Sequence, residues 1–319
     1  MQAIGVDLGG TKIEVGIVDH QGQLLKSSRL ATESAQGPQK IQAKLLKAIK
    51  EIIQSNKEPI AGIGVGIAGQ VDGQTGVVHF APNLPDWYEI PLQTTLFEEI
   101  KLPVKVMNDV RAITMGEWLF GAGQKASDLV CVFVGTGIGG GVVSGGRLLT
   151  GGSNSFAEVG HMAIDVNGPT CGCGNRGCWE AIAGGWGIAK QAQLLAKQDS
   201  FASKKLLELC EGKILNISAK TVVEAYHLKD PLAISLMEAV QNALIIGCAN
   251  LVNLYNPTHF IIGGGVIDGA PGLIEGIKQG VKEKALSAPC RSLSILPARL
   301  GKQVGVVGAA AAIINELAN

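Results

Sequence analysis

Short apolar runs separated by glycine-rich turns dominate the first third of the chain. The pattern predicts strands at residues 3–7, 13–18 and 24–30, with tight turns between them. Residues 38–55 carry apolar side chains at helical spacing, and residues 61–67 read as a further buried strand. The opening third is therefore predicted to fold in the order β-β-β-α-β.

The order of strand, Gly/Thr turn and strand returns in the middle of the chain. Residues 129–134 predict a buried strand, residues 135–141 a glycine-rich turn, and residues 142–143 the start of a second strand. We interpret this repeat as a degenerate internal duplication. It predicts an α/β protein with two facing lobes, each carrying one glycine-rich hairpin.

The rest of the chain alternates between helical and strand patterns. Further strands are predicted at 104–107 and 260–263, and further helices at 92–100, 110–120, 181–197, 219–226, 232–254, 273–285 and 304–317. Residues 69–87 are rich in turn formers, and residues 206–229 are mixed and polar. The last helix is rich in alanine and glycine, so we expect it to pack closely against another element.

Length and charge limit the classes of function. The 319 residues suffice for two domains of ordinary size or one large one. Basic and acidic residues balance at 27 each, without the basic stripe of a nucleic-acid-binding protein. The first residues enter a strand pattern directly, and no uninterrupted apolar run approaches the roughly twenty residues that span a bilayer. We therefore expect a cytoplasmic protein with a small-molecule substrate and no membrane or nucleic-acid partner.

The most specific chemistry lies between residues 158 and 180, which hold three of the seven cysteines and one of the five histidines. Four side chains are candidate Zn²⁺ ligands: His161, Cys171, Cys173 and Cys178. A closed Cys₃His set leaves no open position, so such a site is structural. The alternatives are free thiols in a glycine-rich turn, or a disulfide. Zinc is favoured because clustered cysteines in a chain without export signals more often bind metal.

Two glutamates, Glu158 and Glu180, bracket the cysteine cluster, and neither is needed as a metal ligand. Our hypothesis is that zinc fixes the loop so that both glutamates and His161 face a polar ligand. Asn83 and Asn108, like these three, can pair with vicinal hydroxyls, since such side chains donate or accept hydrogen bonds. Each could equally be an ordinary surface or turn residue.

Three glycine turns are candidate phosphate sites. They are Gly9-Gly10-Thr11, Gly135-Thr136-Gly137 and Gly263-Gly264-Gly265. Concave turns of this kind present backbone N–H groups that bind anions, although a Gly-Gly pair is often only a hairpin turn. No Walker sequence is present, which excludes a P-loop on pattern. The three turns together favour a nucleotide.

Two aspartates follow strands in this pattern. Asp7 ends the first strand beside the first glycine turn, where it can hold Mg²⁺ through water or simply pair with Lys12. Asp109 follows the strand at 104–107 at its carboxyl end, where open α/β sheets bind ligands. It can serve as a general base toward a sugar hydroxyl, or as the cap of the helix that begins there.

Five motifs together resemble the ROK family (repressor, open reading frame, kinase) of sugar kinases. They are Asp7-Leu-Gly-Gly-Thr-Lys12, Asn108-Asp109, Val134-Gly-Thr-Gly-Ile-Gly-Gly-Gly141, Glu158-Val-Gly-His161 and Cys171-Gly-Cys-Gly-Asn-Arg-Gly-Cys178-Trp-Glu180. The resemblance covers essentially the whole chain. It implies an actin/hexokinase-like (ribonuclease H-like) pair of α/β lobes with ATP and sugar in the cleft between them. The small lobe would comprise residues 1–107 and 303–319, and the large lobe residues 108–302 with the second hairpin, the zinc loop and the adenosine region.

The resemblance also assigns roles to residues. Asp109 matches the catalytic base, and His161 would serve both metal and sugar. The sugar contacts would be Gly69, Asn83, Asn108, Asp109, Glu158, His161 and Glu180. The Mg²⁺·ATP contacts would be Asp7, Gly9, Gly10, Thr11, Lys12, Thr136, Gly137, Gly264 and Gly265. The family likeness further suggests a homodimer.

Substrate choice stays open at this point. Members often carry Pro-Gly after the Gly-x-Gly strand, whereas this chain has Ala68-Gly69 near the expected sugar site. Glucose is the first expectation, and fructokinases, mannokinases and N-acetylhexosamine kinases share these motifs. Repressors of the family resemble the kinase preceded by a winged-helix domain, for which we expect no room before the first strand. A non-catalytic sugar sensor is the second alternative, and Asp109 with both Gly/Thr turns argues against it.

Overall fold

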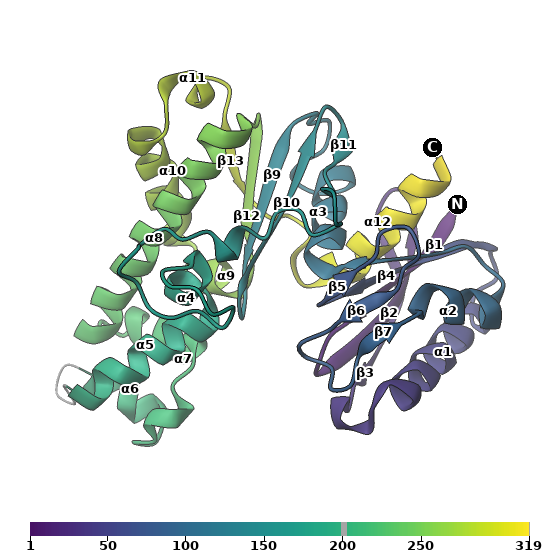
Figure 1. Ribbon diagram of the computed structural model, residues 1–319, viewed down its shortest axis with the longest axis horizontal. Helices are drawn as coiled ribbons and strands as arrows, with labels where there is room; N and C mark the ends of the chain where they lie inside the picture. Colours follow the sequence, from purple (N-terminus) through teal and green to yellow (C-terminus); the bar gives the residue numbers. More distant parts are fainter. Residues whose placement is uncertain (199–202, 319) are drawn as a thin grey trace. The chain divides into compact units, whose positions relative to one another are not determined.

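The computed structural model describes residues 1–198 and 203–318, which form two compact units (Figure 1). Unit 1 comprises Met1–Ser127, Gly141–Phe156 and Ala298–Asn319. Unit 2 comprises Asp128–Gly140 and Ala157–Pro297. These units are defined by their internal contacts, whereas the expected lobes, which divide at 107/108 and 302/303, were inferred from the family resemblance. The lobe boundaries therefore stay a prediction.

Unit 1 is built on a five-stranded sheet with the order β3-β2-β1-β4-β8. The strands are β1 (Gln2–Leu8), β2 (Lys12–Asp19), β3 (Leu24–Ala31), β4 (Ile60–Ile67) and β8 (Val104–Asn108). Strands β1, β2 and β3 form an antiparallel meander, and β4 lies parallel to both β1 and β8. The β-β-β-α-β order predicted for the first third is confirmed.

Helices cover both faces of this sheet. They are α1 (Pro38–Gln54), α2 (Leu92–Ile100), α3 (Asp109–Leu119) and α12 (Val304–Ala318). Ile41, Leu45 and Ile49 on the predicted apolar face of α1 are fully buried in one core with alternate residues of β1, such as Ile4. Residues of the opposite phase, such as Ala3, pack in a second core with α12, which lies beside β1 and α3 in Figure 1.

The last helix approaches the sheet closely, as its composition predicted. A Cβ atom placed on Gly5 would collide with the carbonyl oxygen of Val306, and one on Gly64 with that of Ala309. Glycine in the sheet thus lets the α12 backbone lie directly on β1 and β4.

The turn-rich segment of unit 1 contains a small three-stranded antiparallel sheet that the pattern did not predict. Its strands are β5 (Gln70–Val71), β6 (Val78–Phe80) and β7 (Tyr88–Ile90). With two or three residues each, they are too short to show an alternation.

The second five-stranded sheet has the order β11-β10-β9-β12-β13. Its strands are β9 (Leu129–Val134), β10 (Ile138–Ser144), β11 (Arg147–Leu148), β12 (His259–Gly263) and β13 (Ser294–Pro297). Strand β12 lies parallel to β9 and β13, as β4 does to β1 and β8. The two sheets therefore share one strand order, which agrees with the repeat of strand, glycine turn and strand predicted from the sequence. The four-residue β13 gave no sequence signal.

The helices of unit 2 are α4 (Trp179–Ala183), α5 (Gly185–Gln198), α6 (Lys204–Leu209), α7 (Ala219–His227), α8 (Pro231–Tyr255), α9 (Gly265–Gly269), α10 (Gly272–Lys284) and α11 (Ser287–Cys290). The single helix expected at 181–197 was wrong, because Gly184 adopts an extended conformation and divides it into α4 and α5. The break turns the first N–H groups of α5 toward another loop: Gly185 N donates to Gly135 O and Trp186 N to Thr136 O, both at 2.9 Å.

Helix α8 is the one helix of the described residues that is long and apolar enough to cross a membrane by length and composition. Its apolar window has a mean hydropathy of 1.6, and 56% of that window is buried inside the protein. Asp230 caps its start, and it packs against α4, α5, α7 and α10. This is the environment of a core helix, which explains its composition.

Candidate active site

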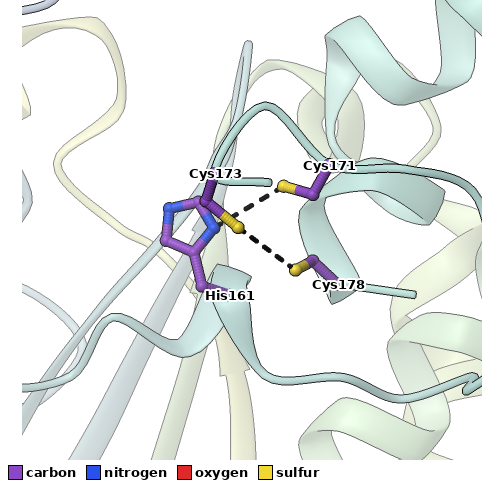
Figure 2. Close-up of side chains that lie close together, drawn as sticks. All are labelled: His161, Cys171, Cys173 and Cys178. Carbon is purple, nitrogen blue, oxygen red and sulfur yellow. Dashed lines mark hydrogen bonds between the residues drawn. The ribbon is translucent and has the colours of Figure 1, made fainter. Parts of the chain in front are cut away.

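Four side chains of unit 2 converge from the loop before α4 (Figure 2). Ligand atoms of His161, Cys171, Cys173 and Cys178 all lie within 4.8 Å of one another. The Cys171 Sγ–His161 Nδ1 distance is 3.7 Å and the Cys173 Sγ–Cys178 Sγ distance is 3.6 Å. A disulfide requires about 2.05 Å, and every described cysteine is free. Ligands about 2.0–2.3 Å from a tetrahedral Zn²⁺ lie roughly 3.3–3.8 Å apart. The set therefore fits zinc.

A backbone hydrogen bond and a glycine shape this loop. Cys171 N donates to Asn175 O at 2.8 Å, which closes a tight turn around Cys173. Gly177 has a φ of 68°, and a Cβ there would collide with the carbonyl oxygen of Asp165. The loop thus requires glycine at this position.

The thiols differ in their acidity. A hydrogen bond from the backbone N–H of Asn175 lowers the pKa of the Cys173 thiol to about 7, whereas burial raises the pKa of Cys178 to about 12. A bound Zn²⁺ stabilises the thiolate form of its ligands.

Glu180 follows the zinc loop in the first turn of α4, whose N-cap is Cys178. Its Oε2 accepts a hydrogen bond from Ile138 N, and its Oε1 accepts one from Trp186 Nε1, both at 2.9 Å. The side chain thus connects the end of the Gly135–Gly137 turn to the start of α5. Sequence reasoning did not foresee either partner.

Two further predicted sugar contacts, Glu158 and His161, lie at the surface of unit 2. Both are exposed: Glu158 is the N-cap of the short 3-10 turn η2 (Val159–His161), and His161 is its last residue. Gly160 in this turn contacts the start of β10, and a Cβ there would collide with the carbonyl oxygen of Ile138. η2 and Glu180, which lie on either side of the cysteine cluster in the sequence, therefore both contact the second Gly/Thr hairpin at Ile138.

The second hairpin borders a cavity of about 590 Å³. The cavity is formed by the Gly135–Thr136 turn and by the starts of α5, α7 and α9, and apolar surface dominates it. Trp186 and Val223 contribute side chains, and Gly265 belongs to the third predicted glycine turn. Ligand pockets are typically apolar clefts of about 300–1,000 Å³ with a few polar groups. The structure thus joins two of the three predicted glycine turns at one pocket.

The first hairpin lies in unit 1 and is closed by backbone hydrogen bonds. Gly9 N donates to Lys12 O at 2.9 Å, and the Thr32 hydroxyl donates to Gly9 O at 2.6 Å. The Asp7 carboxylate lies 3.2 Å from Lys12 Nζ, so the ion pair considered as an alternative is present. Since half-exposed pairs are weak, this contact does not prevent Asp7 from serving a hydrated cation.

The predicted sugar contacts of unit 1 lie beside two different turns: Asn83 beside the first glycine turn, and Asn108 beside the turn after β4. A Cβ on Gly10 would lie 2.7 Å from the carbonyl oxygen of Asn83, so this asparagine borders the first glycine turn. Asn108 Nδ2 donates to Gly69 O at 3.2 Å, which joins the end of β8 to the turn after β4.

The helix cap at the start of α3 is Asn108 rather than Asp109. The Asn108 side chain accepts from Val110 N at 3.0 Å and from Arg111 N at 3.2 Å. Asp109 is the first helical residue, and its Oδ1 accepts from Val110 N at 2.9 Å. The capping alternative for Asp109 is therefore wrong, and a carboxylate is not needed there for the helix.

Comparison with known proteins places the chain. A family model described as ROK family matches residues 3–316. This protein belongs to the ROK family. It is 34% identical over 308 residues to a glucokinase of Streptomyces coelicolor, covering 96% of each chain. A ROK family glucokinase of Streptomyces griseus, solved in complex with glucose and AMPPNP, is 35% identical with a TM-score of 0.82 over 97% of this chain and 98% of that one. The xylose repressor of Bacillus subtilis is 30% identical over 98% of this chain and 77% of that protein.

The ROK match confirms the family and the two-lobed α/β sugar-kinase fold expected from the motifs.

One further residue of unit 1, Arg111, was not among those predicted from the sequence. It is buried, and its guanidinium donates to Asn154 Oδ1 at 2.8 Å and to Thr150 O at 3.3 Å. Asn154 in turn donates to Val71 O at 2.6 Å. Arg111 thus ties the first turn of α3, beside Asp109, to the 150–154 loop, and the sequence carried no signal for this role.

Proposed function

We propose that this ROK protein is an ATP-dependent sugar kinase that transfers the γ-phosphoryl group to O6 of glucose. The similarity to glucokinases over nearly the full chain supports the reaction class and the substrate. The structural observation that carries the proposal is the cavity of unit 2, because it joins an apolar pocket to the glycine turn at Thr136. An adenosine fits such a pocket, and phosphates suit the N–H groups of such a turn.

The nucleotide would use both hairpins. The adenosine occupies the cavity near Gly264 and Gly265, and the phosphates bind the turn at Thr136 and Gly137. The first turn, with Gly9, Gly10, Thr11 and Lys12, contacts the terminal phosphates. Asp7 would hold Mg²⁺ through water, and the ion would neutralise the charge that develops on the phosphates.

The sugar would bind through hydroxyl-pairing groups of both units. Unit 1 supplies Gly69, Asn83 and Asn108, and unit 2 supplies Glu158, His161 and Glu180. Because His161 Nδ1 faces the cysteine cluster, its Nε2 is the ring nitrogen that pairs with the sugar.

Asp109 acts as the general base. It accepts the O6 proton while O6 forms a bond to the γ-phosphorus and the bond from that phosphorus to the bridging oxygen breaks, which gives glucose 6-phosphate and ADP. General-base assistance of this kind contributes about 10²–10⁴-fold. Its position in the first turn of α3, tied by Arg111, fixes the carboxylate on a helix rather than on a loop.

Zinc would be a structural ion of this enzyme. It would be held by His161, Cys171, Cys173 and Cys178. A bound Zn²⁺ would brace the loop between Glu158 and Glu180 without an open position for chemistry.

We also propose that the protein is a cytoplasmic homodimer.

An ADP-release assay with a hexose panel tests the function. We expect turnover with ATP and glucose, and weaker turnover with fructose, mannose, N-acetylglucosamine and N-acetylmannosamine. ATP hydrolysis without sugar should be slow, because water is otherwise a competing acceptor. A higher kcat/KM for another hexose would move the assignment to the corresponding kinase, and binding of sugar without ADP release would establish a sensor instead. Light scattering coupled to gel filtration tests the dimer.

A further inference from the structure

Glu180 lies where three parts of unit 2 meet. The carboxylate accepts one hydrogen bond from the Gly/Thr hairpin, at Ile138 N, and one from a side chain that lines the cavity, Trp186 Nε1. The same corner is closed by the hydrogen bonds from α5 to Gly135 O and Thr136 O. Packing here is tight, because a Cβ on Gly137 would collide with Glu180 Oε2. The Glu180 side chain thus hydrogen-bonds both the second glycine hairpin and Trp186, which lines the cavity.

The carboxylate has capacity for more than these two partners. An ionised glutamate accepts through about four lone-pair sites, and the two N–H donors use two of them. The remaining sites can accept sugar hydroxyls without release of Ile138 N or Trp186 Nε1. Hydrogen bonds to a charged acceptor are also shorter and stronger than neutral ones.

We propose that Glu180 is a positioning residue for the nucleotide: it sets the Thr136 turn and the Trp186 wall of the cavity, and it couples sugar binding to nucleotide binding. Cys178 is the N-cap residue of the helix that carries Glu180, and Glu180 contacts Ile138 N, so the cysteine cluster is connected to the second glycine turn through three consecutive residues. The inference rests on the proposed kinase function and extends it, because a residue that only contacts sugar has no effect on nucleotide affinity when sugar is absent.

Glu180→Gln tests this role because both partners of the carboxylate are N–H donors. The amide of glutamine can accept from only one of them, and its NH₂ group then faces the other donor. We expect the Kd of ADP, measured by calorimetry without sugar, to rise roughly tenfold, the loss of about one charge-assisted hydrogen bond. Glu158→Gln is the matched control: it should raise the KM for glucose and leave the sugar-free Kd of ADP unchanged.

A double-mutant cycle with Trp186→Phe separates positioning from a general structural defect. Phenylalanine keeps an aromatic wall but removes the indole N–H, so the glutamine Oε1 can turn to Ile138 N and its NH₂ to the vacated side. We expect Glu180→Gln to cost clearly less ADP affinity in the Trp186→Phe background than in the wild type, a non-additivity typical of residues in direct contact. Zinc content and circular dichroism confirm that each variant is folded.

The outcomes are distinguishable. If Glu180→Gln binds ADP without sugar as the wild type does, or if the two substitutions are additive, the positioning role is overturned and the kinase assignment stands. If the wild type binds no adenine nucleotide, the proposed function itself fails. Should Glu180→Gln not fold, hydrogen exchange on the wild type decides. Glucose alone must then slow exchange in residues 135–141, and unchanged exchange there would overturn the coupling.

Discussion

Asp109→Asn separates chemistry from stability at the start of α3. The cap of this helix is Asn108, whose side chain accepts from two backbone N–H groups, so the substitution leaves the cap intact. Asparagine also retains an oxygen that can accept from Val110 N, as the Asp109 Oδ1 does at 2.9 Å. The substitution removes the favourable interaction of a charge with the helix N-terminus, which contributes about 0.3–1 kcal/mol.

The loss of activity should be much larger. An amide cannot take the proton of O6, and the missing general base corresponds to about 10²–10⁴-fold in kcat, or roughly 3–5.5 kcal/mol of transition-state stabilisation. We therefore expect kcat for glucose to fall by at least two orders of magnitude, while Tm falls by no more than about 4 °C. The assays are ADP release and thermal unfolding.

Asn108→Ala is the matched control for the cap. It removes the acceptor for two N–H groups and should cost about 1 kcal/mol of unfolding free energy. The larger loss of kcat is thus expected in Asp109→Asn, and the larger loss of unfolding free energy in Asn108→Ala. Turnover within tenfold of the wild type in Asp109→Asn would refute the base assignment, and a Tm loss clearly larger than that of Asn108→Ala would refute the cap assignment.

Three further predictions concern the scaffold. Chelation of the bound metal should lower Tm and raise the KM for glucose, checked by scanning fluorimetry and metal analysis; an unchanged Tm would argue against a structural zinc. Glu117→Gln should lower the unfolding free energy by about 2–4 kcal/mol in urea titrations, because the buried carboxylate accepts from Arg299 N and Ala122 N and the amide would oppose one of these donors. Gly64→Ala should destabilise by at least about 2 kcal/mol, since its Cβ would collide with Ala309 O, whereas alanine at the open Gly272 should have little effect.

Local patterns predicted most of the secondary structure. The apolar spacing of Ile41, Leu45 and Ile49 located α1 and its buried face, and the repeat of a strand before a Gly/Thr turn predicted two sheets of one design. The cysteine spacing likewise predicted a cluster that the structure brings together. In each case the signal lies within one segment of the chain.

Features that depend on contacts between distant segments of the chain could not be predicted from local sequence patterns. The break at Gly184 arises because α5 begins by donating to the 135–136 turn, far earlier in the chain. The partners of Glu180 and the tie between Arg111 and Asn154 also join separate segments. Asn108 and Asp109 are both good capping residues, and only the backbone geometry decides which one caps.

The placement of α12 has a consequence for biosynthesis. This helix is the last element of the chain, yet it covers β1 and β4, which are made among the first. At about 5–20 residues per second, a ribosome takes tens of seconds between them. A sheet that forms during this interval lacks the helix that covers its glycine-lined apolar face in the folded protein, so we expect chaperones or other nascent chains to bind it. Truncation before α12 should therefore yield aggregates rather than a smaller folded protein.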